Sequence, residues 1–187
     1  MECIGLLGNK GSGKDTLADY LVKEKNFVKY SFAKPIKDIA KIMFYLDDEQ
    51  LYDDKKELID KRWNLSPREI IQKIGTEIGQ FMIFDIFPKL KDKISYRCFW
   101  LKHFEIFLEN NKDKNIVISD VRFIHEVKYL KKLNFNIIKI NRDNLKIDNH
   151  ISENEINNIK DIDYVINNNY TKDVLYKQYE HFIYIPF

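Results

Sequence analysis

The stretch GNKGSGKDT, residues 8–16, follows the apolar run CIGLL and decides the fold. Its Gly-x-x-x-x-Gly-Lys spacing is that of a phosphate-binding loop, in which backbone N–H groups surround a phosphate at the start of a helix. Residues 2–7 predict a buried parallel strand, and the apolar residues of 14–25 recur at helical spacing. The strand–loop–helix order is the context that such a loop requires. A glycine-rich turn that merely caps the helix is the weaker interpretation.

The loop predicts a nucleotide site that holds ATP by its phosphates. Glycines allow positive φ and close backbone approach, so the N–H groups of residues 9–14 can encircle a phosphate. Lys14 is expected to reach the β- and γ-phosphates. The residues expected to bind the nucleotide are Gly8, Lys10, Gly11, Ser12, Gly13, Lys14, Asp15 and Thr16.

Asp15 stands where such loops usually carry Ser or Thr, whose hydroxyl helps to hold Mg²⁺. Two interpretations stay open. In one, the Asp15 carboxylate binds the metal ion or its waters and bridges it to the phosphates. In the other, Thr16 faces the phosphates and Asp15 only favours the first turn of the helix.

The composition limits the classes of function. The chain has 187 residues, 44% of them hydrophobic, and a net charge of +2, which suits one globular domain and argues against nucleic-acid or membrane partners. Cys3 and Cys98 form no close pair, which favours reduced thiols and a cytoplasmic location. Acidic Glu2 and the lack of a long apolar run predict neither a signal peptide nor a membrane span.

Strand and helix patterns alternate along the remaining chain. The expected strands are 27–33, 115–120, 135–141 and 164–168. The expected helices are 36–46, 66–87, 100–108, 124–133 and 171–182. This alternation predicts an α/β fold: a P-loop kinase fold with about five parallel strands and helices on both faces of the sheet. We expect a single domain, 1–187, in which a helical insertion at about 36–110 covers the substrate.

Local signals mark the ends of some of these elements. Ser66 and Glu69 form a capping box around Pro67, and Pro88 stops the helix that begins there. Ser152 and Glu155 form a second capping box. The charged stretch 47–57 predicts a mobile or solvated segment.

Phosphoryl transfer requires cations besides the loop lysine, because catalysis is mostly positioning and charge stabilisation. The candidates are Arg68, Arg122 and Arg142, each of which could instead form a surface ion pair. Arg122 follows a buried strand by two residues, where ligands bind in open α/β sheets. Asp120 ends the same strand and could hold Mg²⁺ through water or contact the acceptor; a turn-forming role is the alternative.

The motifs together resemble the viral and phage deoxynucleoside monophosphate kinases over nearly the whole chain. The matching segments are GNKGSGKDT (8–16), FAKPIKD (32–38), PREIIQKIGTEIGQ (67–80), ISDVRFIHE (118–126), NRD (141–143), HISE (150–153) and VINN (165–168). The resemblance implies an ATP- and Mg²⁺-dependent kinase that converts dNMP to dNDP and suggests a homodimer. It is a shorter chain than the phage enzymes, with region 47–65 in place of a longer insertion.

The resemblance also implies roles for individual residues. Arg68 would bind the acceptor monophosphate, Arg122 the acceptor or transferred phosphate, and Arg142 would act as a lid arginine over ATP. The remaining substrate positions are Lys34, Lys37, Gln72, Thr76 and Trp100, with Asn167 near adenine and Asp15, Thr16 and Asp120 near the metal. Gln72 has an amide that can read a base edge, and its alternative is an exposed helix residue. Trp100 and the phenylalanines around it could stack on a base, but core packing is favoured for most of them.

Two other functions fit the loop. One is a P-loop kinase for another small acceptor, such as dephospho-coenzyme A or phosphomevalonate. The other is a nucleotide-binding switch without transfer activity. The three arginines argue for a kinase, because a binding module has less need of several cations.

Overall fold

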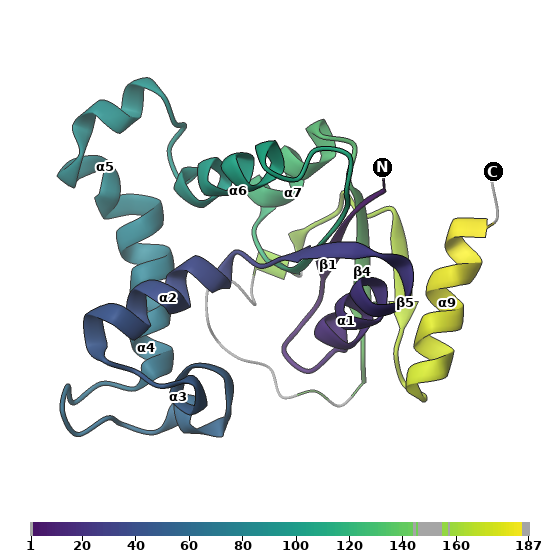
Figure 1. Ribbon diagram of the computed structural model, residues 1–187, viewed down its shortest axis with the longest axis horizontal. Helices are drawn as coiled ribbons and strands as arrows, with labels where there is room; N and C mark the ends of the chain where they lie inside the picture. Colours follow the sequence, from purple (N-terminus) through teal and green to yellow (C-terminus); the bar gives the residue numbers. More distant parts are fainter. Residues whose placement is uncertain (1, 144, 146–154, 157, 185–187) are drawn as a thin grey trace. The chain divides into compact units, whose positions relative to one another are not determined.

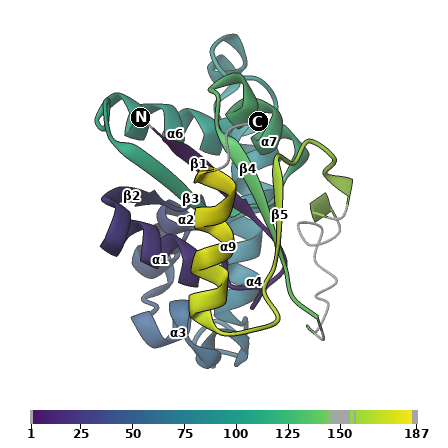
Figure 2. The same cartoon turned by 90° about the vertical axis from the view of Figure 1, so that its right-hand side faces the viewer.

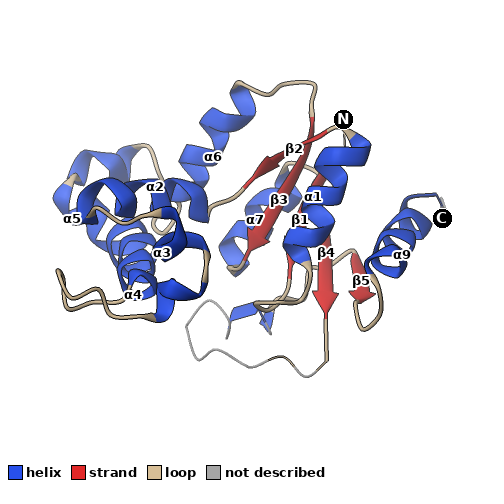
Figure 3. Cartoon of the chain, turned by 60° about the horizontal axis from the view of Figure 1, so that its bottom comes forward, coloured by secondary structure: helices blue, strands red, loops and turns tan. Residues whose placement is uncertain are grey.

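β1 (Cys3–Leu7) is the central strand of a five-stranded parallel sheet whose strand order is β2-β3-β1-β4-β5 (Figure 3). The other strands are β2 (Phe27–Tyr30), β3 (Asn115–Val121), β4 (Asn136–Asn141) and β5 (Tyr164–Asn167). Every neighbouring pair is parallel. The sheet confirms the predicted α/β class, and its carboxyl ends meet at one edge, where ligands bind in such folds.

Helices cover both faces of the sheet, as predicted. On one face, α1 (Lys14–Lys25) and α9 (Lys172–Tyr184) pack their apolar residues on Ile4 and Leu6. These two helices lie side by side, with stacked tyrosine rings 4.0 Å apart (Figure 2). On the other face, Leu130 of α7 (Ile124–Lys132) lies over Gly5. Successive residues of β1 therefore face opposite layers, which explains why the run CIGLL is apolar throughout.

The computed structural model describes residues 2–143, 145, 155–156 and 158–184 (Figure 1). The chain divides into two units: Met1–Ser31 with Asn111–Phe187, called here the sheet unit, and Phe32–Asn110, called here the helical unit. Two sequence expectations, the HISE segment at 150–153 and the capping residue Ser152, lie outside the described residues. Within the described part of the chain, no helix is both long and apolar enough to cross a membrane.

The helical unit consists of short helices. They are α2 (Ala33–Phe44), α3 (Asp48–Tyr52), η1 (Asp54–Glu57), α4 (Pro67–Gln72), η2 (Lys73–Met82), α5 (Ile83–Ile86), η3 (Pro88–Asp92) and α6 (Phe99–Glu109). Helix α2 begins three residues before the predicted start, so Pro35 sits inside its first turn, where a backbone N–H is not needed.

The charged segment 47–57 forms two short helices, α3 and η1, and most of its residues are exposed, which agrees with the solvated alternative. Asp47 accepts a hydrogen bond from the N–H of Gln50 at 2.8 Å, and the Gln50 side chain accepts one from the N–H of Asp47 at 3.1 Å. This reciprocal capping box begins α3. Buried Leu51 then fixes the helix to the unit.

The helix that Ser66 opens runs to Ile86 and stops before Pro88, as predicted, but its middle is not α-helical. Residues Lys73–Met82 form a π-helix, η2. Such helices are rare and are often found at functional sites. Trp100 packs along this segment: its Nε1 donates to the carbonyl of Gly75 at 2.8 Å. A Cβ atom at Gly79 would lie 2.5 Å from that Nε1, so the indole occupies the space a side chain would need.

We expect Gly79→Ala to lower the free energy of unfolding by about 1–3 kcal/mol, because the added methyl group must displace a rigid indole. Gly75→Ala is the matched control, since its Cβ would meet only the flexible tip of Ile36 at 2.9 Å. That variant should be close to neutral, or gain up to ~1 kcal/mol from helix propensity. Urea unfolding of the two proteins measures the difference, and equal stabilities would contradict the packing described for Trp100.

Candidate active site

The phosphate loop joins β1 to α1, and its glycines are required by their surroundings. Gly8 has φ 149° and Gly13 has φ 107°, a region that other residues rarely adopt. A Cβ atom at Gly8 would lie 2.3 Å from the carbonyl oxygen of Ile140 on β4. The loop can therefore pass this close to the neighbouring strand only if residue 8 is glycine.

Lys14 is folded over the loop that precedes it. Its Nζ donates to the carbonyl oxygens of Gly8 at 2.6 Å and of Asn9 at 2.8 Å, and the residue is only 7% exposed. Lysine is almost never buried without partners. The loop thus holds a positive charge at its centre, where an incoming phosphate can bind it.

Asn168 holds the loop from the side of β5. Its Nδ2 donates to the carbonyl of Ser12 at 2.8 Å, and its own N–H donates to the carbonyl of Asn141 at 2.8 Å. The sequence prediction selected Asn167, whose side chain is exposed. Strand periodicity could have identified Asn168, because Ile166 faces the core and residues two apart share a face.

A cavity of about 300 Å³ lies beside the loop, bordered by the ends of β4 and β5. Gly8, Ser12, Lys139, Arg142 and Asn167 are among its lining residues. The Nη1 atom of Arg142 lies 3.5 Å from the carbonyl oxygen of Gly11, at the outer limit of a hydrogen bond. The Oγ of Ser12 is buried and has no hydrogen-bond partner among the described residues. This arrangement leaves polar and cationic groups around a space next to the phosphate loop.

The segment after Arg142 is fastened to the loop after β5. Asp143 donates its N–H to Oδ1 of Asn169 at 2.9 Å, and Nδ2 of Asn169 donates back to Oδ2 of Asp143 at 2.7 Å. Two hydrogen bonds in opposite directions fix these segments relative to each other. No motif in the sequence identified this pair.

The carboxylate of Asp15 is paired with Lys29 on β2. Lys29 Nζ lies 3.1 Å from Oδ1 of Asp15 and 2.9 Å from Oδ1 of Asp19, and the Asp15 side chain is 77% exposed. Burial lowers the pKa of Lys29, but the two carboxylates outweigh it and raise that pKa overall. This geometry favours the interpretation in which Asp15 belongs to the first turn of α1 and the Thr16 side chain faces the phosphates. Thr16 is half-buried.

The carboxyl end of β3 carries Asp120 and Arg122. Ser31 donates its hydroxyl to Oδ2 of Asp120 at 2.7 Å. Glu126 lies below this turn, and its Oε2 accepts the backbone N–H groups of Arg122 at 2.8 Å and Phe123 at 3.0 Å. Glu126 therefore anchors the turn on which Arg122 sits.

Burial controls the protonation of the groups around this turn. It raises the pKa of Glu126 to about 8, with the two backbone N–H groups opposing and the Asp120 charge adding to the shift. Burial also raises the pKa of Tyr30, and the charges of Asp120 and Glu126 raise it further. A neutral Glu126 can still accept both hydrogen bonds, so the turn keeps its anchor in either state.

The other predicted residues lie in the helical unit. Arg68, in the first turn of α4, pairs with Glu57 at 3.1 Å. Lys34 pairs with Asp38, and Lys37 lies 3.7 Å from the centre of the Tyr52 ring. The exposed Lys34–Asp38 ion pair contributes little stability, so Lys34 can exchange partners.

The aromatic residues of the helical unit mostly belong to its core. Trp100, Phe84 and Phe104 are buried, whereas Phe87 is exposed. Trp100 donates its N–H to a backbone carbonyl and packs on Gly79, which agrees with the core interpretation rather than with base stacking. Gln72 is half-buried and Thr76 is buried.

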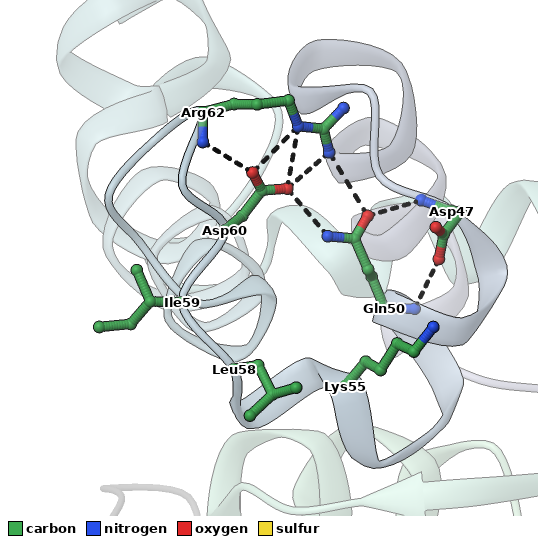
Figure 4. A pocket seen from close by; sticks show the side chains of 7 residues that line it. All are labelled: Asp47, Gln50, Lys55, Leu58, Ile59, Asp60 and Arg62. Atoms are coloured by element: carbon green, nitrogen blue, oxygen red, sulfur yellow. Dashed lines mark hydrogen bonds and ion pairs between the residues drawn. The ribbon is translucent and has the colours of Figure 1, made fainter.

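A second cavity, of about 420 Å³, lies within the helical unit (Figure 4). Asp60 pairs with Arg62 and accepts a hydrogen bond from Gln50, as the dashed lines in Figure 4 show. Nη2 of Arg62 lies 2.5 Å from Oδ2 of Asp60, and Nε2 of Gln50 donates to the same oxygen at 2.8 Å. These contacts, with Arg62 the largest contributor, hold the pKa of Asp60 well below its usual range. The carboxylate of Asp60 and the guanidinium of Arg62 neutralise each other. We therefore interpret the groups in this cavity as stabilising the turn 60–65 rather than as binding a ligand.

The described residues contain no group of three or more His, Cys, Asp or Glu side chains that could hold a metal ion by itself. Mg²⁺ commonly takes one or two protein ligands and otherwise water and substrate phosphates. A hydroxyl at Thr16 and a carboxylate at Asp120 fit such a site.

Three comparisons relate the chain to known proteins. The family model described as deoxynucleotide monophosphate kinase matches residues 2–64 and 49–179. A protein of Acanthamoeba polyphaga mimivirus, which carries the provisional name deoxynucleotide monophosphate kinase, is 40% identical over 182 residues, covering 95% of this chain and 94% of the relative.

More distant matches include the deoxynucleoside-5'-monophosphate kinase of Escherichia phage T5, which is 24% identical over 194 residues, with 70% of this chain and 72% of the phage protein covered. The crystal structure of TT1252 from Thermus thermophilus covers 100% of both chains at 13% identity and a TM-score of 0.47. A likeness at that level adds nothing to the two sequence matches.

We expect the thermal stability of the protein to fall as pH rises from about 5 to 9, and to fall less in Glu126→Gln. The folded state raises the pKa of Glu126 from 4.5 to about 8, so it binds more protons than the unfolded chain between these values. Stability that depends on this proton is therefore lost as pH passes through the folded pKa. Melting temperatures across this range measure the effect. Glu109→Gln, at an exposed position, is the control, and parallel curves for wild type and Glu126→Gln would contradict the assignment.

Proposed function

Because the chain belongs to the deoxynucleotide monophosphate kinase family, we propose that it moves the γ-phosphoryl group of ATP to a deoxynucleoside monophosphate, giving ADP and the diphosphate. The observation that supports this most directly is the phosphate loop with Lys14 buried at its centre. The family assignment favours this reaction over the dephospho-coenzyme A, phosphomevalonate and switch alternatives that the loop alone allows.

The donor site is assigned to the sheet unit. ATP phosphates would bind the N–H groups of the loop and the Nζ of Lys14, which would exchange its carbonyl partners for phosphate oxygens. The cavity beside Ser12, Arg142 and Asn167 would take the remainder of the nucleotide. Arg142 would add a second positive charge over the phosphates as a lid residue.

The acceptor roles are proposed residue by residue, each from that residue's own contacts. Arg68 would release Glu57 and bind the acceptor monophosphate, because a guanidinium binds phosphate oxygens in pairs. Lys34, Lys37, Gln72 and Thr76 complete the acceptor residues of the helical unit. Arg122, on the turn anchored by Glu126, would bind the acceptor or the transferred phosphate.

Mg²⁺ would be held by the ATP phosphates together with the Thr16 hydroxyl and, directly or through water, Asp120. When bound, it would neutralise charge that develops on the phosphates during transfer. The chain itself contributes the fixed positions of these oxygens: Thr16 by its place in α1, and Asp120 by the hydrogen bond from Ser31.

We also propose a homodimer in the cytoplasm, which is that of the host if the protein is viral, as its mimivirus relative suggests. The helical unit exposes large apolar side chains, among them Ile42 and Tyr45, that a second copy would cover. Sedimentation velocity reads out this state directly.

A coupled ADP-release assay with each deoxynucleoside monophosphate tests the reaction. We expect turnover on the order of 1–100 per second with at least one acceptor. Lys14→Met should reduce it by ~10²-fold or more, since it removes a charge that stabilises the transferring group. Lys112→Met, at an exposed position, is the control. ATP binding without acceptor-dependent ADP release would exclude the kinase, and turnover only with dephospho-coenzyme A or phosphomevalonate would reassign the acceptor.

Magnesium titration separates the roles of Asp15 and Thr16. We expect Asp15→Asn to leave the Mg²⁺ concentration for half-maximal activity unchanged, because Lys29 already pairs with that carboxylate. Thr16→Ala should raise it several-fold, by about 1 kcal/mol for one lost ligand contact. Asp19→Asn removes the other partner of Lys29 and serves as the matched control. A higher requirement in Asp15→Asn alone would place Asp15 at the metal.

A further inference from the structure

Two polar residues are buried on the π-helix η2 of the helical unit. Thr76 is 8% exposed and Gln80 is 2% exposed, and the two residues beside Gln80 are Gly79 and Phe81. Burying an amide is costly unless it forms hydrogen bonds. The position of Gln80 therefore needs an explanation that packing does not supply.

Arg97 fixes which way the Gln80 amide points. The Nε atom of Arg97 lies 3.2 Å from Oε1 of Gln80. A guanidinium can only donate, so the atom that faces it must be the amide oxygen. The NH₂ group of Gln80 is consequently turned away from Arg97. Among the residues that the structure describes, the side chain of Gln80 makes no other hydrogen bond.

Arg97 is itself held in place by two further features. Its backbone has φ 67°, a left-handed conformation that is uncommon outside glycine. Its guanidinium lies 5.5 Å from the centre of the Phe81 ring, within cation–π distance. Strained backbone of this kind persists where the surrounding structure imposes it and is found at functional sites. Arg97 is thus suited to orient Gln80.

Gln80 also lies on the segment to which the acceptor is assigned. Arg68 opens the same continuous run of helix, and Thr76 precedes Gln80 by about one turn. Twelve residues separate Arg68 from Gln80, at most about 18 Å along a helix. An extended arginine side chain and a nucleotide together span a distance of this order, with the phosphate at Arg68 and the base at Gln80.

We propose that Gln80, oriented by Arg97, determines base specificity by donating from its NH₂ group to the base of the acceptor nucleotide; this rests on the proposed kinase function. A fixed donor selects bases with a keto oxygen. Guanine presents N7 and O6 as acceptors and thymine presents O4, whereas adenine and cytosine present an amino group at the matching position. The preferred acceptors are therefore dGMP and dTMP, and Arg97 is a positioning residue.

Gln80→Glu tests this inference, because it replaces the NH₂ donor by an acceptor oxygen and keeps a partner for Arg97. We expect the ratio of kcat/KM for dTMP to that for dCMP to fall by about tenfold or more, since a site built around one hydrogen bond discriminates strongly. The KM for ATP should not change. A ratio of two acceptors within one protein cancels any general loss of activity.

Two further variants control the result. Glu77→Gln exchanges the same two functional groups at an exposed position of the same π-helix and should leave the ratio unchanged. Arg97→Lys keeps the positive charge but loses the planar Nε donor, so the amide can turn and the ratio should move towards one. Melting temperatures show which variants fold. If Gln80→Glu does not fold, the ratio measured for Arg97→Lys decides the question.

The outcomes separate the two proposals. A wild-type enzyme that phosphorylates no deoxynucleoside monophosphate would defeat the proposed function and this inference with it. A wild type that is active but prefers dAMP or dCMP would overturn the inference alone. So would an unchanged ratio in folded Gln80→Glu, or a shifted ratio in Glu77→Gln.

Discussion

The close approach of Gly8 to the carbonyl of Ile140 is the constraint on which the sheet unit depends. Any side chain at residue 8 would stand 2.3 Å from that oxygen, so β1 can leave the sheet as a tight loop only through glycine. The same loop is held by Asn168 after β5 and is filled by the Nζ of Lys14. Three adjacent parallel strands therefore shape a single anion site at their carboxyl ends.

Acids close to an anion site would repel a phosphate, and three described acids of the sheet unit, Asp15, Asp120 and Glu126, each have a hydrogen-bond or ion-pair partner. Asp15 pairs with Lys29, Asp120 accepts from Ser31, and Glu126 is buried under two backbone N–H groups with its pKa raised to about 8. Pairing, hydrogen bonding and protonation are the three ways to lower the effective negative charge of a carboxyl group. Asp120 and Glu126 can therefore hold neighbouring groups in place while the negative charge near the phosphate loop stays low.

In the helical unit, the sequence predicted where the long helix begins and ends, but it did not predict that its middle is a π-helix. Ser66 and Pro88 mark the ends of the long helix because capping depends on local residues. The π-helix between them packs against Trp100, which lies twenty-one residues beyond Gly79 and donates to the Gly75 carbonyl. Charge alone likewise does not reveal the capping pair of Asp47 and Gln50 that begins α3 in the charged segment 47–57.

The sequence by itself determined the α/β class, the phosphate loop and the identity of Lys14 as the loop cation, because these follow from periodicity and spacing within short segments. The family followed from the resemblance of several segments in order along the chain. Only the tertiary structure decided that Asn168 bonds the carbonyl of Ser12, that Lys29 pairs with Asp15, and that Arg97 contacts Gln80. Those contacts join residues that are distant in the chain. Packing of the whole chain sets such contacts, and no local pattern encodes them.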